Sequence, residues 1–423
     1  MIKFYFVVLI SFWIDITSVI IIPFKREISD IKNENPESFY NFLMNNNMIT
    51  YINMGNPNQK IKTSIKFDEG YYYIKNKNQN GDYDENTSFS YKKINEISLI
   101  NEIFKFKHAI LSNETFLFSN EYNKEIKIEN LQFLIPKEEN KKLEKATIGL
   151  YYKEISLIKN INFITQLKTL NKINSYIFTL EYENELNGKL YIGNYLHVFN
   201  KTYEQNYFKY YYPGMISMAF SWDIKFENIS FGNKLIALSK TCFFNATLNG
   251  ILSNSIFDNI LKETFFNIYL NNNSCSEYFS INSEYKFYIC DDYINLEKFS
   301  FLNFMHKELN YSFVFNSDDL FIRKNRKLYF KILFNVKNNI MWQLGQTFLQ
   351  KYLFTFNQDR KIFGFYVKFI KKSFFFSILY IIIIFLLIIC IGLIYILYNN
   401  KIFKSRKIRA NELEDNFEYI TQN

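Results

Sequence analysis

The chain has 423 residues, which is enough for one large two-lobed domain, or two ordinary ones, with a well-filled core. Its formal net charge of +9 comes from lysines scattered along the sequence, several of them beside an apolar segment near the C-terminus, so the charge does not indicate nucleic-acid binding.

The N-terminal region is typical of a secreted protein. Residues 1–22 combine the basic Lys3 with two apolar runs, which predicts a secretory signal peptide; an uncleaved anchor is the alternative. Residues 23–47 are polar and charged and are expected to form a short pro or linker segment. The folded domain is expected to begin at residue 48.

A strand followed by an acidic turn dominates the first half of the chain. After residues 51–59, alternating apolar positions from Ile61 to Phe67 predict a strand that ends in Asp68-Glu69-Gly70. A glycine at such a turn lets the backbone pass close to its neighbours. This stretch resembles the first active-site loop of the pepsin-like aspartic proteases, hydrophobic-Asp-Thr-Gly-Ser, with Asp68 kept and Glu69 in place of the threonine.

The next segments follow the order of that family. Residues 104–111 lie where the family has its flap hairpin, and the resemblance places His108 at the flap tyrosine; an ordinary strand histidine is the alternative. Residues 146–150 and 187–193 match two later strands. Residues 342–365 resemble the family's closing Leu-Gly-Asp-x-Phe segment and its last strand. The resemblance therefore implies an all-β, bilobal pepsin-like fold with short helices, an N-lobe over 48–200 and a C-lobe over 201–366.

The second active-site loop is altered. An apolar lead-in at Phe243-Phe244 and a helix predicted at 255–261 set the register, which puts Asn245 at the second aspartate, Ala246 at the threonine and Thr247 at the glycine. Enzymes of this family need two acids about 3 Å apart that share one proton. The sequence therefore predicts that the second catalytic acid is absent.

Two other acids, Asp258 and Glu69, are candidates to replace it. Asp258 comes about thirteen residues too late and lies on a predicted helix. Glu69 is adjacent to Asp68 on an extended segment and is expected to point to the opposite face. Neither is a convincing partner for Asp68.

The C-terminal region carries an apolar segment over residues 374–398 without a charged side chain. A helix of this length could span a bilayer, so the sequence predicts a single transmembrane helix, a stem over 367–373 and a cytoplasmic tail over 399–423. The folded domain would then face the lumen of the ER, the Golgi or a secretory organelle, or the cell exterior.

The chain has four cysteines, and Cys390 falls within the apolar segment. Because the family often has a disulfide in its second lobe, Cys275 and Cys290 are expected to pair, which leaves Cys242 as a free or intermolecular thiol. The three histidines are scattered and no cysteines cluster, so the sequence predicts no metal site and no cofactor.

Two hypotheses of function follow. In the first, the protein is a membrane-anchored pseudoprotease of the secretory pathway that binds a polypeptide or a partner protein, because an amide at position 245 can neither accept nor deliver a proton. In the second, it is an atypical aspartic endopeptidase in which Asp68 is paired with another group, such as His108. A structural or adhesive protein on an unrelated all-β fold is a third reading.

Overall fold

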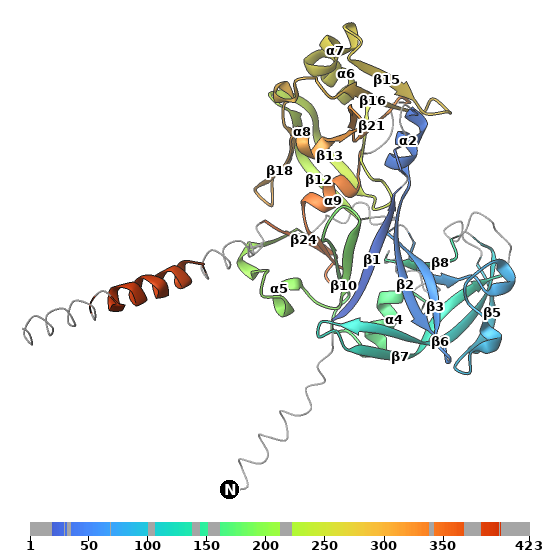
Figure 1. Cartoon of the computed structure of the whole chain (residues 1–423). Coiled ribbons are helices and arrows are strands. Elements are labelled where there is room, and N and C mark those ends of the chain that lie inside the picture. The colour runs from blue at the N-terminus through green and yellow to red at the C-terminus, as the bar shows by residue number, and fades with distance from the viewer. Residues whose placement is uncertain are drawn as a thin grey trace, which may run out of the picture. The chain divides into compact units, whose positions relative to one another are not determined.

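The structure is a computed structural model, and it describes residues 19–28, 30–31, 35–67, 69–99, 106–137, 144–150, 161–211, 222–337, 342–367, 382–396 and 398. The chain forms two compact units, residues 1–368 and residues 369–423. Figure 1 shows the larger unit as two β-rich lobes. Asp68 lies outside the described residues.

The first lobe is built on a 13-stranded sheet in the order β11-β24-β23-β9-β10-β1-β2-β3-β8-β4-β7-β6-β5. Its strands are β1 (Ile20–Ile28), β2 (Asn46–Met54), β3 (Gln59–Lys66), β4 (Tyr72–Ile74), β5 (Lys92–Ser98), β6 (His108–Asn120), β7 (Glu125–Pro136), β8 (Ala146–Gly149), β9 (Ile177–Tyr182), β10 (Asn187–Ile192), β11 (Phe208–Tyr211), β23 (Phe354–Asn357) and β24 (Ile362–Tyr366).

The second lobe is built on an 11-stranded sheet in the order β18-β17-β12-β13-β22-β14-β21-β16-β20-β19, with β15 paired to β16. Its strands are β12 (Asp223–Phe231), β13 (Lys234–Phe244), β14 (Ile251–Asn254), β15 (Cys275–Phe279), β16 (Tyr285–Asp291), β17 (Leu302–His306), β18 (Tyr311–Phe315), β19 (Phe321–Lys324), β20 (Lys327–Phe330), β21 (Ile332–Asn335) and β22 (Trp342–Leu344).

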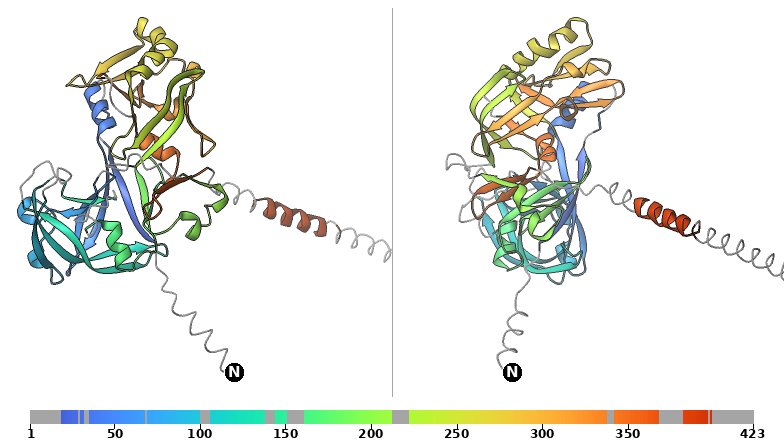
Figure 2. Two further views of the ribbon diagram at one scale, coloured as in Figure 1. Left: turned by 180° about the vertical axis from the view of Figure 1, so that it is seen from behind. Right: turned by 90° about the vertical axis from the view of Figure 1, so that its left-hand side faces the viewer.

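The helices of the described part of the larger unit are short, as expected for a β protein (Figure 2). They are α2 (Pro36–Met44), α4 (Phe163–Thr169), α5 (Leu196–Phe199), α6 (Ser255–Leu261), the π-helical η4 (Lys262–Phe266), α7 (Asn267–Asn271), α8 (Ser317–Leu320), α9 (Gln346–Lys351) and the single 3₁₀ turns η1 (Lys77–Gln79), η2 (Glu85–Thr87), η3 (Gln205–Tyr207) and η5 (Leu296–Lys298).

The two lobes repeat one local arrangement. In the first, β3 runs into the Asp68 loop and pairs in parallel with β8; in the second, β13 runs into the Asn245 loop and pairs in parallel with β22. A glycine follows closely in each: a Cβ at Gly149 would lie 2.1 Å from the Glu69 carbonyl oxygen, and a Cβ at Gly345 would lie 2.3 Å from that of Leu248. Only glycine permits such a close approach behind a loop. The two lobes therefore share this local arrangement, which the pepsin-like interpretation requires.

The segment expected to be a signal peptide followed by a linker contributes to this fold from residue 19 onward. Strand β1 begins at Ile20 and pairs with β10, β2 and β6, and its residues Ile20, Ile22 and Phe24 are buried. Helix α2 then crosses to the second lobe, where Phe39 packs against Phe287 and Tyr329. Residues 23–47 thus connect both lobes (Figures 1 and 2).

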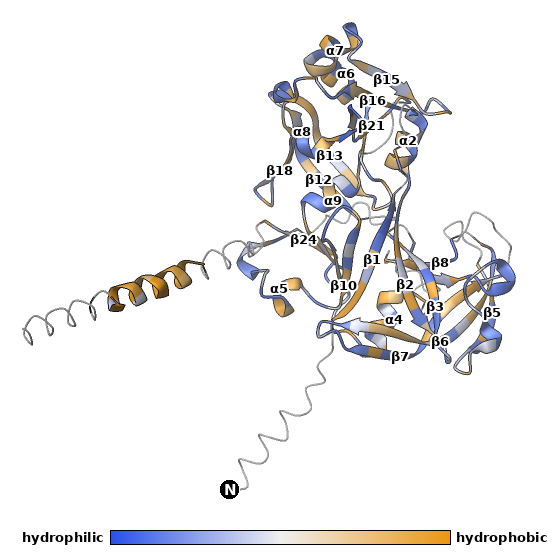
Figure 3. Ribbon diagram, in the orientation of Figure 1, coloured by the Kyte–Doolittle hydropathy of each residue, from blue (hydrophilic) through white to orange (hydrophobic). Residues whose placement is uncertain are grey.

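The predicted transmembrane helix over 374–398 is wrong for this structure. In the smaller unit the main described helix covers residues 382–396, and Figure 3 shows it as hydrophobic over most of its length. Among the described residues, no helix combines the length and the apolar character needed to cross a membrane.

The predicted disulfide between Cys275 and Cys290 is confirmed, and it joins opposite residues of β15 and β16. Cys242 is a free and fully buried thiol in β13, and burial raises its pKa. Its thiol is therefore inaccessible for a disulfide with another chain. Of the two expectations for Cys242, a free thiol and an intermolecular one, the free thiol holds.

Removing the disulfide should cost about 3 kcal/mol of the free energy of unfolding, because the bond closes a loop of 15 residues and restricts the unfolded chain. Alanine at both Cys275 and Cys290 tests this in urea denaturation. Alanine at the exposed Cys390 is the matched control and should leave the transition unchanged. Equal midpoints for the double variant and the wild type would contradict the expectation.

Candidate functional site

The second loop begins where β13 ends. Phe244 is buried in the core, and the backbone amide of Asn245 donates to the Leu344 carbonyl at 3.0 Å. This bond continues the pairing of β13 with β22 by one residue. The end of the strand therefore places Asn245 next to the closing Leu344-Gly345 segment, as the predicted register requires.

The Asn245 side chain is held by three hydrogen bonds. Its Oδ1 accepts from the Thr247 amide at 3.0 Å and from the Thr247 hydroxyl at 2.7 Å, while its Nδ2 donates to Gln343 Oε1 at 2.8 Å. Because a backbone N–H can only donate, the oxygen must face Thr247 and the nitrogen must face Gln343. Asn245 is thus a neutral and oriented amide, and no other hydrogen bond to its side chain occurs among the described residues.

The start of α9 holds the Asn245 loop in place through hydrogen bonds. Gln346 is fully buried, and its Nε2 donates to the Ala246 carbonyl at 2.6 Å. The Gln346 and Thr347 amides donate to the carbonyls of Leu248 and Asn249. These bonds satisfy amides at the first turn of the helix, which have no partner within it. The loop is therefore rigidly supported.

The flanks of the first loop are also well ordered, although Asp68 itself lies outside the described residues. Phe67 packs edge-on against Phe178 and Phe356, and the Gly70 carbonyl accepts from Asn162 Nδ2 at 3.0 Å. Glu69, which replaces the family's threonine, is only 3% exposed. Together with burial, its charge raises the pKa of the Tyr73 hydroxyl.

Asp258, the first acid weighed as a substitute, belongs to a separate buried cluster. It forms an ion pair with Lys286 and accepts from the Tyr288 hydroxyl at 2.5 Å. Its side chain is 6% exposed and that of Lys286 is 8% exposed. This carboxylate is engaged away from Asn245, which agrees with its rejection as a partner acid.

His108 is the first residue of β6, opposite Ser98 of β5, in the hairpin proposed as the flap. Its side chain is exposed, and its Nδ1 lies 3.3 Å from the Ser98 hydroxyl. The residues between the two strands, 100–105, lie outside the described part. β5 and β6 pair in antiparallel fashion here, and His108 makes no described contact with Asn245. The role of His108 in a flap stays a prediction.

Sequence reasoning missed Gln343 as the partner of the Asn245 amide. The available signal was the pattern Trp342-Gln343-Leu344, in which a polar residue alternates with two buried ones. It also missed Gln346, which stands at the aspartate of the Leu-Gly-Asp motif. A buried glutamine after Leu-Gly could have been assigned to loop support from that motif alone.

The larger unit has a two-lobed fold of the kind expected from the pepsin-like resemblance, and Asn245 lies in the loop that follows β13. No family model matches the sequence, and no curated protein matches it either. Among solved structures, the chain is similar to the basic 7S globulin from soybean, with a TM-score of 0.60 and 10% identity over 84% of this chain and 96% of the globulin. It is also similar to conglutin gamma, a basic 7S globulin from lupine seeds, with a TM-score of 0.59 and 12% identity over 84% and 96% of the two chains. These globulins have folds related to the aspartic proteases, and at such low identity the likeness shows the fold alone.

Proposed function

We propose that this protein is a divergent pepsin-like protein that does not hydrolyse peptides and acts by binding a polypeptide. The observation that carries this proposal is the Asn245 side chain, whose nitrogen and oxygen are both committed to Gln343 and Thr247. A pepsin-like reaction needs a proton at this position that moves between the carboxyl group and the substrate. An amide supplies none at ordinary pH.

The energetic argument for inactivity is one of magnitude. General acid–base assistance by one positioned group contributes about 10² to 10⁴ in rate. Asp258 is paired with Lys286 in its own cluster, and no described acid hydrogen-bonds to Asn245. The proposal therefore assigns a lone acid, Asp68, to the site, which leaves peptide hydrolysis slower by about this factor.

Binding an extended polypeptide does not require the missing acid. A peptide lying in a cleft can be held by strand-like backbone hydrogen bonds and by pockets for alternate side chains. The likeness to two globulins shows the scaffold, and the hairpin of β5 and β6 supplies strands at one end of the first sheet.

We place the domain in an oxidising compartment of the secretory pathway. The support is the Cys275–Cys290 disulfide, because such bonds persist in secreted and lumenal proteins and are rare in the cytosol. The apolar run before β1 fits entry into that pathway.

The purified full-length chain should bind members of a pooled peptide library between pH 4 and pH 7 without cleaving them. Mass spectrometry of the pool measures cleavage, and capture on the immobilised chain measures binding. The matched variant is Asp68→Ala, which should leave both readouts unchanged. Reproducible cleavage that Asp68→Ala abolishes would make the protein an active aspartic endopeptidase and overturn the proposal.

A further inference from the structure

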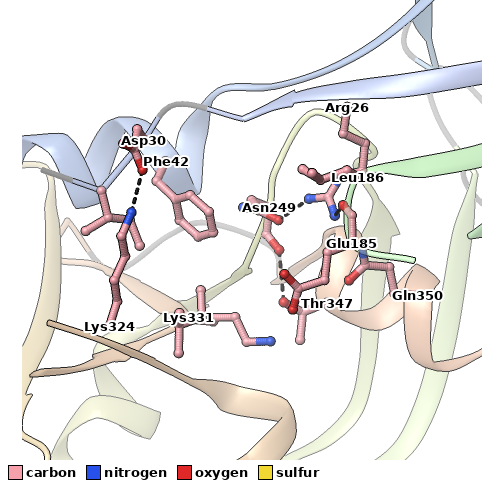
Figure 4. A pocket seen from close by; sticks show the side chains of 12 residues that line it. Arg26, Asp30, Phe42, Glu185, Leu186, Asn249, Lys324, Lys331, Thr347 and Gln350 are labelled. Atoms are coloured by element: carbon pink, nitrogen blue, oxygen red, sulfur yellow. Dashed lines mark hydrogen bonds and ion pairs between the residues drawn. The ribbon is translucent and has the colours of Figure 1, made fainter. Parts of the chain in front are cut away.

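A pocket lies where the N-terminal segment passes from one lobe to the other. Its volume is about 350 Å³. It is lined by Arg26 of β1, Asp30, Ile31, Phe42 of α2, Glu185 and Leu186 from the hairpin of β9 and β10, Asn249, Ile322, Lys324, Lys331, Thr347 and Gln350. Figure 4 shows their side chains. The second lobe contributes the last six of these residues, so both lobes build the pocket.

Lys331 is the notable cation of this pocket. Its ammonium group points into the open space below Asn249 in Figure 4. This ammonium group makes no hydrogen bond and no ion pair with any residue that the structure describes. By contrast, the neighbouring Lys324 is paired with Asp30. Lysines deep in a fold are normally paired, so an unpaired ammonium lining a pocket is available for an anion.

Asn249 provides a second donor without a partner. It is 5% exposed, and its Oδ1 accepts from an Arg26 guanidinium N–H at 2.5 Å, which fixes the orientation of the amide. Its Nδ2 is buried and has no hydrogen-bond partner among the described residues, and the same holds for Gln350 Nε2. An unsatisfied buried donor is unfavourable, and a bound acceptor would remove that cost.

The pocket is also lined by four apolar side chains, Ile31, Phe42, Leu186 and Ile322. Small-molecule sites typically combine such apolar side chains with a few convergent polar groups. We propose that this pocket binds a small carboxylate with an apolar body, whose oxygens lie between the Lys331 ammonium and the Asn249 amide. A free organic acid and the C-terminal residue of a peptide share this chemistry. This proposal does not depend on the function proposed for the Asn245 loop.

Glu185 is the acidic side chain of this pocket that would compete with a bound carboxylate for the Lys331 ammonium. It lines the pocket and is exposed, and it forms no ion pair with Lys331 among the described residues. Burial lowers the pKa of Lys331 to about 8, with Arg26 and Lys351 acting in the same direction and Asp319 and Glu185 opposing it. Lys331 is therefore cationic below pH 8 and loses its charge above it, so carboxylate affinity should fall as the pH rises through about 8.

Isothermal titration calorimetry of 3-phenylpropanoate with the full-length chain at pH 7 tests the site. The neutral isostere 3-phenylpropanamide is measured in the same way. We expect saturable binding of the acid and at least about tenfold weaker binding of the amide. Lys331→Met should weaken acid binding at least about tenfold, and Lys331→Arg should retain it. Lys324→Met, at the paired lysine of the same pocket, is the matched control and should change it by less than about threefold.

Several outcomes would overturn the proposal: no saturable binding of the acid, equal binding of the amide, equal binding of inorganic sulfate, or an unchanged affinity in a folded Lys331→Met variant. If Lys331→Met does not fold, Glu185→Gln decides, because removal of the competing carboxylate should tighten binding and an unchanged affinity counts against the site. A peptide ending in Phe with a free carboxylate, compared with its C-terminal amide, separates the sources. Binding of the free-carboxylate peptide alone supports a peptide terminus, and exclusion of both peptides supports a free acid.

Discussion

Replacing Lys286 with methionine should lower the free energy of unfolding by about 3–5 kcal/mol. Lys286 and Asp258 form an ion pair in which both side chains are more than nine-tenths buried, and Tyr288 adds a hydrogen bond to the same carboxylate. The methionine leaves that carboxylate buried without its counter-charge, and this uncompensated charge causes the loss. Urea denaturation followed by circular dichroism measures it.

Two further variants separate this effect from a general loss of packing. The pair Lys234 and Glu263 is about half exposed on both sides, so Lys234→Met should cost no more than about 1 kcal/mol. The double variant Asp258→Leu with Lys286→Met removes both charges together and should recover most of the stability lost by Lys286→Met alone. Equal losses in the Lys286 and Lys234 variants would show that the buried pair has no special role.

Sequence alone predicted the parts of this fold that depend on local motifs. The two strand-to-loop junctions, the closing Leu344-Gly345 segment and the Cys275–Cys290 pair each carry a signal within a few residues. A glycine behind each loop is one such signal, since the close backbone approach at Gly149 excludes any larger residue.

The ends of the chain were harder because their local patterns are ambiguous. The apolar residues Ile20 and Ile22 resemble the end of a signal peptide, and only pairing with β10, far away in sequence, shows that they form a strand. The predicted linker over residues 23–47 contains helix α2, in which Phe39 and Leu43, four residues apart, form the buried face.

In the candidate sites, too, features with a local sequence signal could be predicted and long-range contacts could not. Asn245 could be found because an apolar strand end fixes its register, and its hydrogen bond to Gln343 could not, because that residue lies almost a hundred positions later. The carboxylate pocket had no local signature at all. Arg26, Glu185 and Lys331 meet only because β1 passes between the lobes. A motif search cannot find such a site, because its residues come together only in the folded chain.

Replacing Asn245 with aspartate should raise Asp68-dependent peptide cleavage by about 10² or more over the wild type at pH 4–5. The loop already offers the donors that a carboxylate needs, because the Thr247 amide and hydroxyl point at Oδ1. Gln343 can rotate its amide so that its NH₂ group donates to the second oxygen. The change therefore restores an acid in a prepared environment. Cleavage of the peptide pool, measured by mass spectrometry, reports the gain.

The Asn245→Asp gain must disappear when Asp68→Ala is added, because a pair of acids shares the proton. Asn245→Ala, which removes the amide without adding an acid, should stay at the wild-type level. If a folded Asn245→Asp variant does not cleave the pool, the missing acid is not the limiting defect. The buried Glu69, which stands where the family has a threonine hydroxyl, would then be the group to change next, and Glu69→Thr in the Asn245→Asp background would measure its contribution.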